Sequence, residues 1–318
     1  MKSVLYPPTI DWDFLFQRPQ HLMTQFAKNN WKVHYINKTQ RYKNVEELRP
    51  NLYLHHDFSI FLKRVKKVDI LYISSPRQYC LCDKIEADLV IYDCVDKFNE
   101  WVEYEEEIMK KADIIFAASQ YLYEEKKKYH DKVFLIRNAC DYEYFQNKME
   151  VPLDISRLKR PLVALIGAMG KWVDKKILAR VANEFPTVLI GQEFGNNLPE
   201  GVINLGSKSY TQLPYYYNNI DVGLIPFDKS DTSKAANPVK MYEYLAAGKP
   251  VVGSKLTELE IIDEVCTVDG PGEFIEQINK ALAKDCIELK EKRKKIAREN
   301  TWEKRFEKIE SILIEYLS

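Results

Sequence analysis

The stretch NPVKMYEYLAAGKPVV, residues 237–252, contains the start, the body and the end of one short helix. Asn237 is a favourable N-cap, and Pro238 suits the first helical position because that position needs no amide donor. Gly248 suits the left-handed position after the last turn, and Pro250 prevents continuation into the apolar run VVGS. The segment therefore predicts a helix that begins at Pro238 and is followed directly by a buried strand.

The run DVGLIPF, residues 221–227, precedes this helix and has the apolar pattern of a buried parallel strand. Because strand, loop and helix form a βα unit, the helix should begin at the carboxyl edge of a parallel sheet, where doubly wound folds bind ligands. Unpaired amides and the positive dipole end favour a phosphate there, and Lys240 adds a full charge. Glu243 lies on the same face as Lys240. The unit suits a nucleoside diphosphate with its ribose hydroxyls; the alternative is a plain surface ion pair between Lys240 and Glu243.

Composition excludes several classes of protein. The 318 residues suffice for two domains, and 47 basic against 47 acidic residues give no overall field that would point to nucleic acid. The basic runs KKK and KEKRKK indicate solvated helix faces or a weak contact with an anionic surface. No run approaches the about 20 apolar residues that span a bilayer, and the start of the chain lacks the apolar core of a signal peptide. We expect a cytoplasmic protein, at most in peripheral contact with the inner face of the membrane.

Neither the six cysteines nor the five histidines show metal-ligand spacing. Cys80 and Cys82 stand one residue closer than a CxxC pair, and no second pair follows, so reduced thiols are expected. HExxH is absent, and no Asp-x-Asp motif follows a strand. The sequence predicts a site without a metal, in which lysines and a helix dipole neutralise a departing diphosphate.

Two series of short apolar runs alternate with amphipathic helices, which predicts two parallel sheets. The first series comprises SVLY, WKVHYIN, DILYIS, DLVIYDC, DIIFAAS and KVFLIRN, and the second PLVALIGAMG, TVLIGQ, VINLGS, DVGLIPF and PVVGS. The pattern loosens after Phe145 in QNKMEVPLDISRLKRP, which predicts the linker. We expect one domain over residues 1–150 and another over 160–300, with a cleft between them. The terminal segment, residues 301–318, carries an apolar stripe typical of an amphipathic helix.

The pattern PxKxYEYLAAGKPVV after DVGLIPF resembles the donor site of GT-B glycosyltransferases of the retaining family 4. WDFLFQRPQHLMTQFA, YDCVDKF, IGAMGKWVD and TWEKRF extend the resemblance over nearly the whole chain, towards the bacterial teichuronic acid and cell-surface polysaccharide glycosyltransferases. The resemblance implies an α/β GT-B fold, in which two Rossmann-like doubly wound domains face each other across a cleft. It also implies that the terminal helix packs back on the first domain.

The resemblance assigns roles in the second domain residue by residue. Glu243 matches the second glutamate of the family's E-x7-E signature, which binds the ribose hydroxyls of the nucleotide. The first glutamate, placed against the transferred sugar, is replaced by Ala235, and this departure leaves Asn237 or Asp231 as candidates to face the sugar. The family holds the diphosphate with an arginine and a lysine after the first strand of this domain. The corresponding loop GAMGKWVDKK lacks the arginine.

Lys171 is the nearest basic candidate in that loop, and Gly167 and Gly170 would let the backbone approach the phosphates. The alternative for Lys171 is plain surface exposure, and Trp172 either stacks on a ring or covers the core, with the core favoured. Base recognition would fall to the loops after TVLIGQ and VINLGS. These loops contain Ser207, Lys208 and Tyr210. The predicted donor-binding residues are Glu243, Lys240, Asn237, Pro238, Lys171, Gly170 and Ser207.

The first βα turn of the chain, YPPTIDWDFLFQRPQ, should carry the acceptor side. Trp12 suits a sugar ring, because its face is apolar and its edge can donate a hydrogen bond. Asp13 lies beside it, and Arg18 begins the next helix. Arg18 would meet a phosphate or an acidic acceptor; the alternative is a structural pair with Asp13 or Asp11.

Asp93 and Asp96 in YDCVDKF follow a buried strand, at the position where family 4 enzymes often have a histidine or aspartate near the reacting carbon. We predict Asp96 as the first catalytic candidate and Asp93 as the second. Either could instead cap the helix expected to begin near Phe98.

The resemblance implies a glycosyltransferase that needs no metal or cofactor. Its expected partners are a nucleotide sugar and a glycan or lipid-linked acceptor, and no nucleic acid. Two other functions remain open. A catalytically silent glycan- or nucleotide-binding partner would account for Ala235. A sugar-nucleotide epimerase would share the architecture, although it should carry more acid and base residues in the second half of the chain.

Overall fold

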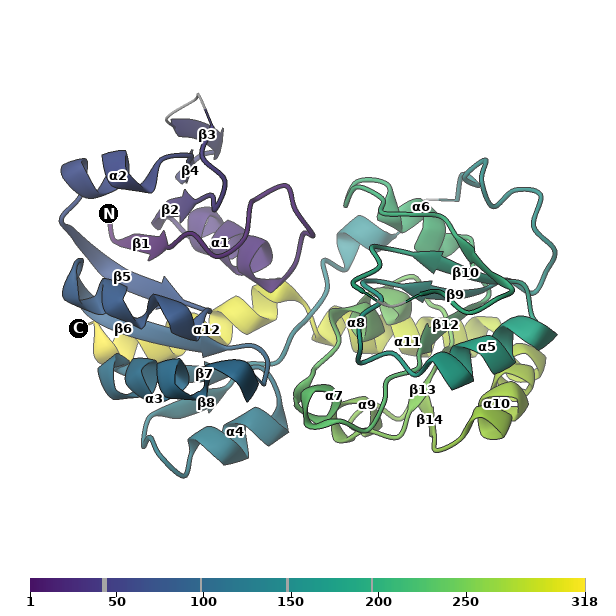
Figure 1. The fold of residues 1–318 in the computed structure, drawn as a ribbon. Coiled ribbons are helices and arrows are strands. Elements are labelled where there is room, and N and C mark those ends of the chain that lie inside the picture. The colour runs from purple at the N-terminus through teal and green to yellow at the C-terminus, as the bar shows by residue number, and fades with distance from the viewer. Residues whose placement is uncertain (42–44, 98, 147–148, 196, 318) are drawn as a thin grey trace. The chain divides into compact units, whose positions relative to one another are not determined.

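The structure is a computed structural model of the 318-residue chain, and it describes all residues except 42–44, 98, 147–148, 196 and 318. The described chain divides into two compact units (Figure 1). The first unit comprises Met1–Asn138 together with Trp302–Ser318, and the second comprises Ala139–Thr301. Each unit is an α/β layer structure around a parallel sheet, as the alternating pattern of the sequence predicts.

The sheet of the first unit has the strand order β3-β4-β2-β1-β5-β6-β7-β8 among the described residues. Its strands are β1 (Ser3–Tyr6), β2 (Lys32–Ile36), β3 (Val45–Arg49), β4 (Leu52–His55), β5 (Lys67–Ile73), β6 (Glu86–Cys94), β7 (Ile114–Ala117) and β8 (Val133–Leu135). The strands pair in parallel, except that the edge strand β3 runs antiparallel to β4. Strands β1, β5 and β6 are neighbours, so the loops that follow them share one edge of the sheet.

Helices cover this sheet, and the last helix of the chain is one of them. The helices are α1 (Arg18–Lys28), α2 (Phe58–Arg64), the 3₁₀ helices η1 (Pro76–Asp83) and η2 (Asn99–Trp101), α3 (Val102–Lys111), α4 (Gln120–Lys126) and α12 (Trp302–Tyr316). Trp302 stacks on His21 of α1 with ring centroids 4.8 Å apart, and Phe306 meets Phe26 edge to face at 4.9 Å. The amphipathic stripe of the terminal segment therefore packs on the first unit.

The sheet of the second unit has the order β11-β10-β9-β12-β13-β14, and all its described pairs are parallel. Its strands are β9 (Val163–Ile166), β10 (Thr187–Ile190), β11 (Val202–Asn204), β12 (Val222–Ile225), β13 (Val251–Ser254) and β14 (Val265–Val268). The chain winds outwards in one direction from β9 to β11 and in the other from β12 to β14. The junction of β9 and β12 is therefore the topological switch point, which is where doubly wound sheets bind ligands.

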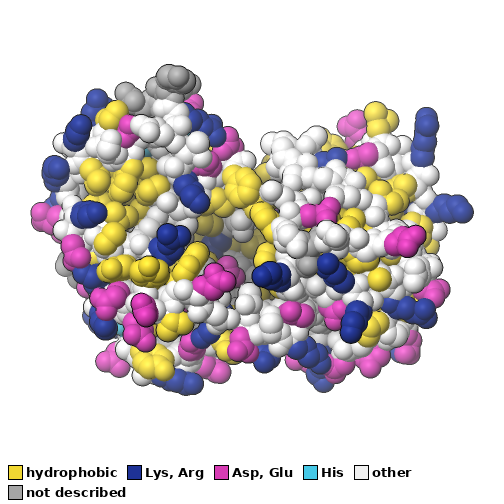
Figure 2. All heavy atoms as spheres, in the orientation of Figure 1, with side chains coloured by type: hydrophobic (Ala, Val, Ile, Leu, Met, Phe, Trp, Pro, Cys, Tyr) yellow, Lys and Arg dark blue, Asp and Glu magenta, His cyan; other side chains and the backbone are white. Residues whose placement is uncertain are grey.

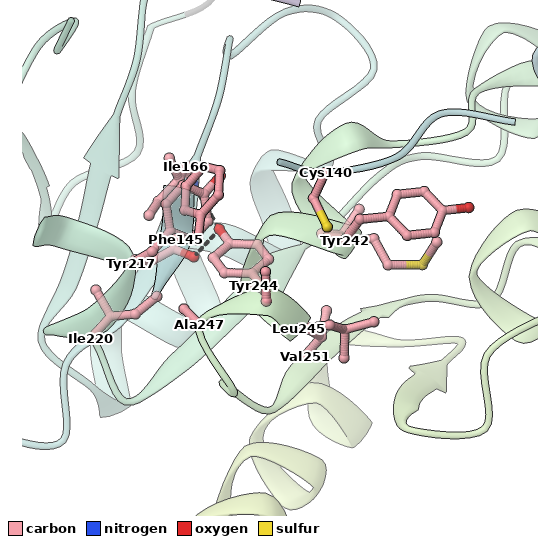
Figure 3. Close-up of a cluster of buried hydrophobic side chains, with 14 of the residues drawn as sticks. Cys140, Phe145, Ile166, Tyr217, Ile220, Tyr242, Tyr244, Leu245, Ala247 and Val251 are labelled. Atoms are coloured by element: carbon pink, nitrogen blue, oxygen red, sulfur yellow. Dashed lines mark hydrogen bonds between the residues drawn. The ribbon is translucent and has the colours of Figure 1, made fainter. Parts of the chain in front are cut away.

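The helices of the second unit are η3 (Glu143–Phe145), α5 (Lys175–Glu184), α6 (Leu213–Asn218), α7 (Asp231–Ala235), α8 (Val239–Ala246), α9 (Thr257–Glu260), α10 (Pro271–Lys284) and α11 (Ile287–Glu299). A cluster of buried side chains fills the space between α8 and the sheet (Figure 3). Phe145, Tyr217 and Tyr244 lie side by side in it, with centroid distances of 5.1 and 5.0 Å along the row. The Tyr244 hydroxyl donates to the Ala164 carbonyl at 2.9 Å and accepts from the amide of Ile166 at 2.8 Å, which fixes helix α8 to the end of β9.

The division of the chain differs from the sequence prediction. The first unit ends at Asn138 rather than near residue 150, and Phe145, expected at the start of a linker, is fully buried in the core of the second unit. Tyr142 is also buried there, so aromatic burial assigns this stretch to the second unit although its sequence lacks a period. All of the expected strands are present. No strand is predicted from the sequence at β3, β4 or β14, and the segment that forms α7 is expected to be a loop.

Acidic and basic side chains are interspersed on the surface of each unit, without a broad area of one sign on the visible face (Figure 2). This distribution agrees with the balanced charge of the sequence. Among the residues that the structure describes, no helix combines the length and the apolar character needed to cross a membrane.

Candidate functional site

Helix α8 begins one residue later than the sequence predicts. Pro238 occupies the N-cap position with extended backbone angles, and it makes no side-chain capping hydrogen bond. Asn237 is therefore outside the helix, and its buried side chain donates to Glu258 and to Tyr242. The predicted end is confirmed: Gly248 has φ +72°, its amide donates to the Leu245 carbonyl, and the amide of Lys249 donates to the Tyr244 carbonyl. These two bonds form a Schellman motif, which needs a residue that tolerates positive φ.

Lys240 and Glu243 form an ion pair at 2.9 Å, but it is not a surface pair. The Glu243 side chain is only 1% exposed, and Lys240 is 27% exposed. Tyr217 of α6 donates its hydroxyl to Glu243 Oε2 at 2.6 Å. Burial, followed by the charge of Glu243, raises the pKa of Tyr217 well above 10, so the phenol keeps its proton and acts as a donor. The helix thus carries a buried, paired carboxylate one turn from its amino end.

Glycines at the ends of β9 and β10 bring backbone close to Lys240. A Cβ on Gly167 would lie 3.5 Å from Lys240 Cγ, and Gly167 has φ +141°. A Cβ on Gly191 would lie 1.9 Å from the carbonyl oxygen of Gly167, a separation that no side chain can accept. Gly191 therefore allows the loop after β9 to pass over the end of β10. Lys240, the amino end of α8 and this glycine loop converge at the switch point of the sheet.

A hollow of about 440 Å³ lies farther along the same loop. It is lined by Gly170, Lys171, Trp172, Phe194, Asp228, Ser230 and Thr232, which follow β9, β10 and β12. The Trp172 ring covers Gly170, since a Cβ there would lie 2.3 Å from the ring, and it also packs against the core. Lys171 is exposed. Trp172 therefore packs against the core, as expected, and also forms part of the wall of the hollow.

The predicted base-recognition residues lie after β11. Ser207 is exposed. Lys208 pairs with Asp154 at 2.7 Å and lies over the Tyr216 ring, while Tyr210 stacks on Tyr144 at 4.9 Å. Lys208 and Tyr210 thus hold the loop in place, and the role of Ser207 stays a prediction.

The position of the missing family glutamate is buried. Ala235 is fully buried at the end of α7, so its side chain presents no polar group. Asp231, one candidate to replace it, is exposed at the start of α7 and pairs with Lys234 at 3.1 Å. Asn237, the other candidate, donates to Glu258 Oε2 at 2.7 Å and to the Tyr242 hydroxyl at 3.2 Å.

In the first unit, Trp12 in the loop after β1 is held by aromatic packing and by one hydrogen bond of its backbone amide. Trp12 meets Phe16 and Tyr35 edge to face at 5.6 and 5.0 Å, and its amide donates to Asn37 Oδ1 at 2.8 Å. Asp13 is exposed and pairs with Arg41 at 2.9 Å. The predicted acceptor roles of Trp12 and Asp13 stay predictions.

Arg18 lies at the start of α1, as expected, but its partner is neither Asp11 nor Asp13. Its guanidinium donates to both oxygens of Asp93, with Nε–Oδ2 at 2.8 Å and Nη2–Oδ1 at 2.7 Å, and also to the carbonyl of Ile136. Both side chains are buried. This arrangement favours a structural role for Arg18 and Asp93 over contact with a substrate.

Asp96 lies two residues beyond the end of β6 and is exposed. The helix cap suggested for Asp96 or Asp93 is not formed on α3, whose N-cap is Trp101. Phe98 lies outside the described residues. Asp96 thus keeps its place at the carboxyl edge of the first sheet, and its catalytic role stays a prediction.

Sequence reasoning missed three residues of the second-unit site: Tyr217, Gly191 and Glu258. Gly191 follows directly on the strand TVLI, so a glycine at a strand end was an available signal. Tyr217 and Glu258 meet their partners through the tertiary fold, and no local sequence signal indicates either. No cluster of three or more metal-ligating side chains occurs among the residues that the structure describes.

Comparisons with known proteins agree with this architecture. The sequence is 30% identical over 263 residues to the Bacillus subtilis (strain 168) protein named "Putative teichuronic acid biosynthesis glycosyltransferase TuaH". The match covers 70% of this chain and 66% of that relative, so the chain spans about two thirds of its length. No protein-family model matches the sequence.

Two solved structures share the fold over almost the whole chain. Sucrose-phosphate synthase from Thermosynechococcus elongatus has a TM-score of 0.76 at 13% identity, with 99% of each chain covered. Anabaena HepE in complex with UDP-glucose has a TM-score of 0.70 at 14% identity, with 99% of this chain and 100% of that chain covered. Two Rossmann-like units of this kind define the GT-B class. Within that class, the chain is similar in sequence to the Bacillus subtilis protein, whose name describes it as a glycosyltransferase.

Proposed function

We propose that this protein transfers a sugar from a uridine-diphosphate sugar to a hydroxyl group of a glycan or lipid-linked acceptor. The observation that carries the proposal is the convergence of Lys240, Glu243 and the Gly167 loop at the switch point of the second sheet. The sequence similarity to the Bacillus subtilis glycosyltransferase supports transferase chemistry, and HepE, which shares the fold, is described in complex with UDP-glucose.

The charges suit a nucleoside diphosphate. The amino end of α8 leaves backbone amides without helical partners, and Lys240 stands in the first turn. Both would stabilise the negative charge that develops on a departing diphosphate, so the proposed transfer needs no resident cofactor or metal. Glu243 would accept hydrogen bonds from the ribose hydroxyls once Lys240 turns towards the phosphates.

The hollow beside Trp172 suits the sugar half of the donor. It offers the apolar face of Trp172 together with the polar side chains of Lys171, Ser230 and Thr232. Such a mixture recognises carbohydrate, because a sugar ring has apolar faces and a polar rim. Gly170, in the wall of the hollow, stands three residues after Gly167. Because three residues of extended chain span about 10 Å, the hollow lies close to the proposed diphosphate position.

Binding and turnover test the proposal separately. Isothermal titration of UDP, GDP, ADP and CDP should show tightest binding for UDP. The variant Lys240→Gln should weaken UDP binding. Lys280 is an exposed lysine of α10, so the control variant Lys280→Gln should leave UDP binding unchanged. A panel of UDP-sugars should then show slow hydrolysis or transfer. Binding of UDP without turnover of any UDP-sugar would favour the silent binding partner. Isomerisation of the donor without loss of UDP would favour an epimerase, and absence of binding by all four nucleotides would refute the donor site.

A further inference from the structure

A buried carboxylate stands behind the amino end of helix α8. Glu258 is only 1% exposed, and its Oε2 accepts a hydrogen bond of 2.7 Å from Nδ2 of Asn237. Asn237 is itself only 3% exposed and directly precedes Pro238, the N-cap of α8. A carboxylate so deeply buried is costly unless it is hydrogen-bonded, so the bond to Asn237 is a constrained one.

Glu258 is in turn held by the sheet. Helix α9 follows β13, and Leu259 beside Glu258 is fully buried against Gly253, where a Cβ would lie 2.7 Å from Leu259 Cδ1. The hydroxyl of Ser254 at the end of β13 donates to the carbonyl of Phe227 beyond β12. The loops after β12 and β13 are therefore joined at two points, and the Asn237–Glu258 bond is the one nearest to α8.

The N-cap residue Pro238 makes no side-chain capping bond, so the bond from Asn237 is important for the helix start. Asn237 has the residue type of an N-cap, yet Pro238 occupies that position, and Nδ2 of Asn237 donates to Glu258 and to Tyr242. The bond to Glu258 therefore fixes the residue that directly precedes the start of α8, the end of the helix at which a diphosphate would bind.

We infer that Glu258 is a positioning residue of the donor site: through Asn237 it fixes the amino end of the helix that carries Lys240 and Glu243. The inference rests on the proposed function, because it concerns how the same site holds a nucleoside diphosphate. Glu258 also supplies a buried carboxylate from helix α9, beside the segment in which Ala235 of α7 supplies none.

A reciprocal exchange tests the inference. Asn237→Asp alone would face two buried carboxylates, so one must take up a proton or the two must separate. We expect UDP binding to weaken by about tenfold, as for the loss of other supporting residues around a site. Adding Glu258→Gln restores one donor and one acceptor with the polarity reversed, and UDP affinity should return to the wild-type value. Glu258→Ala should behave like Asn237→Asp.

Amide hydrogen exchange over residues 237–243 gives a readout that needs no ligand. Exchange there should accelerate in Asn237→Asp and in Glu258→Ala and slow again in the double variant. Glu260→Gln is the matched control, because it removes a charge from an exposed position of the same short helix and should change neither readout. Thermal unfolding of each variant shows whether the measurements are made on folded protein.

The outcomes separate the two proposals. Unchanged exchange at α8 in both single variants overturns the positioning role, and so does altered exchange with unaltered UDP affinity. A wild-type protein that does not bind UDP, combined with the predicted changes in exchange, leaves Glu258 as the residue that fixes α8 and refutes the proposed donor. Failure of the double variant to recover, while it remains folded, also counts against the inference.

Discussion

Arg18 and Asp93, which are 75 residues apart in the chain, form a buried bidentate ion pair at 2.7 and 2.8 Å. The pair joins the first turn of α1 to the penultimate residue of β6, and the exposed fractions of the two side chains are 4% and 0%. Arg18 also donates to the Ile136 carbonyl, so the pair reaches the last segment of the first unit. The two residues that the sequence assigned to acceptor and catalysis are thus each other's partner.

Breaking this pair should destabilise the first unit strongly. Arg18→Met leaves a buried carboxylate without its counter-charge, and we expect a loss of about 3–5 kcal/mol in the free energy of unfolding. The double variant Arg18→Met/Asp93→Leu should lose much less, because no charge remains buried. Urea denaturation followed by circular dichroism measures both. Equal losses in the single and double variants would show that the pair contributes through packing alone.

Nucleotide binding should depend on Glu243 far more than on Asp96. Glu243→Ala removes the carboxylate predicted to accept from the ribose hydroxyls, and hydrogen bonds to charged groups contribute about 1.5–3 kcal/mol. We therefore expect UDP affinity to fall at least about tenfold, whereas Asp96→Ala should change it little. Calorimetric titration provides the comparison. Wild-type affinity in Glu243→Ala would remove the ribose assignment, provided the variant remains folded.

The close approach of Gly191 to Gly167 predicts a backbone effect on binding. Gly191→Ala places a methyl group 1.9 Å from the Gly167 carbonyl oxygen, so the glycine loop must move away from β10. We expect weaker UDP binding by about tenfold or more, because small displacements of binding groups are costly. Gly272→Ala is the control, since a Cβ at that position of α10 meets no atom within 4 Å. Unchanged affinity in Gly191→Ala would show that the loop position does not matter for the nucleotide.

Two neighbouring histidines should make the stability of the first unit sensitive to acid. His34 Nδ1 and His55 Nε2 are 3.0 Å apart, and burial, followed by repulsion from neighbouring cationic groups, lowers the pKa of His34 to about 3 and of His55 to about 4. The unfolded chain, with histidine pKa values of about 6.5, binds more protons than the folded one between pH 6.5 and 4. The stabilisation is therefore complete above pH 6.5 and is lost as pH falls through this window.

Replacing one of these histidines should reduce that dependence. We expect the difference in unfolding free energy between pH 7 and pH 5 to be smaller in His34→Asn than in the wild type by about 1–2 kcal/mol. Urea midpoints at the two pH values measure it, and the carboxylates common to both proteins cancel in the comparison. An identical pH dependence in the two proteins would mean that His34 titrates normally in the folded state.

Local signals in the sequence predicted much of the fold. The alternation of strands and helices indicated two parallel sheets, and Gly248 marked the end of α8. These signals succeed because strand burial and helix termination depend on residues only a few positions apart. The same reasoning placed Lys240 and Glu243 on one face of one helix, where the structure has them paired. It failed for Phe145, whose burial depends on α6 and on Tyr217.

The sequence by itself determined the βα unit at residues 221–254, its glycine stop, and the lysine and glutamate one turn apart. Only the tertiary structure decided that Glu243 is buried against Tyr217, that Asn237 turns to Glu258, and that Arg18 meets Asp93. The physical reason is the sequence separation of the residues that make each contact. Helix periodicity and termination follow from contacts within about four residues. Partners on different loops meet only after the strand order has brought the carboxyl ends of their strands to one edge of the sheet.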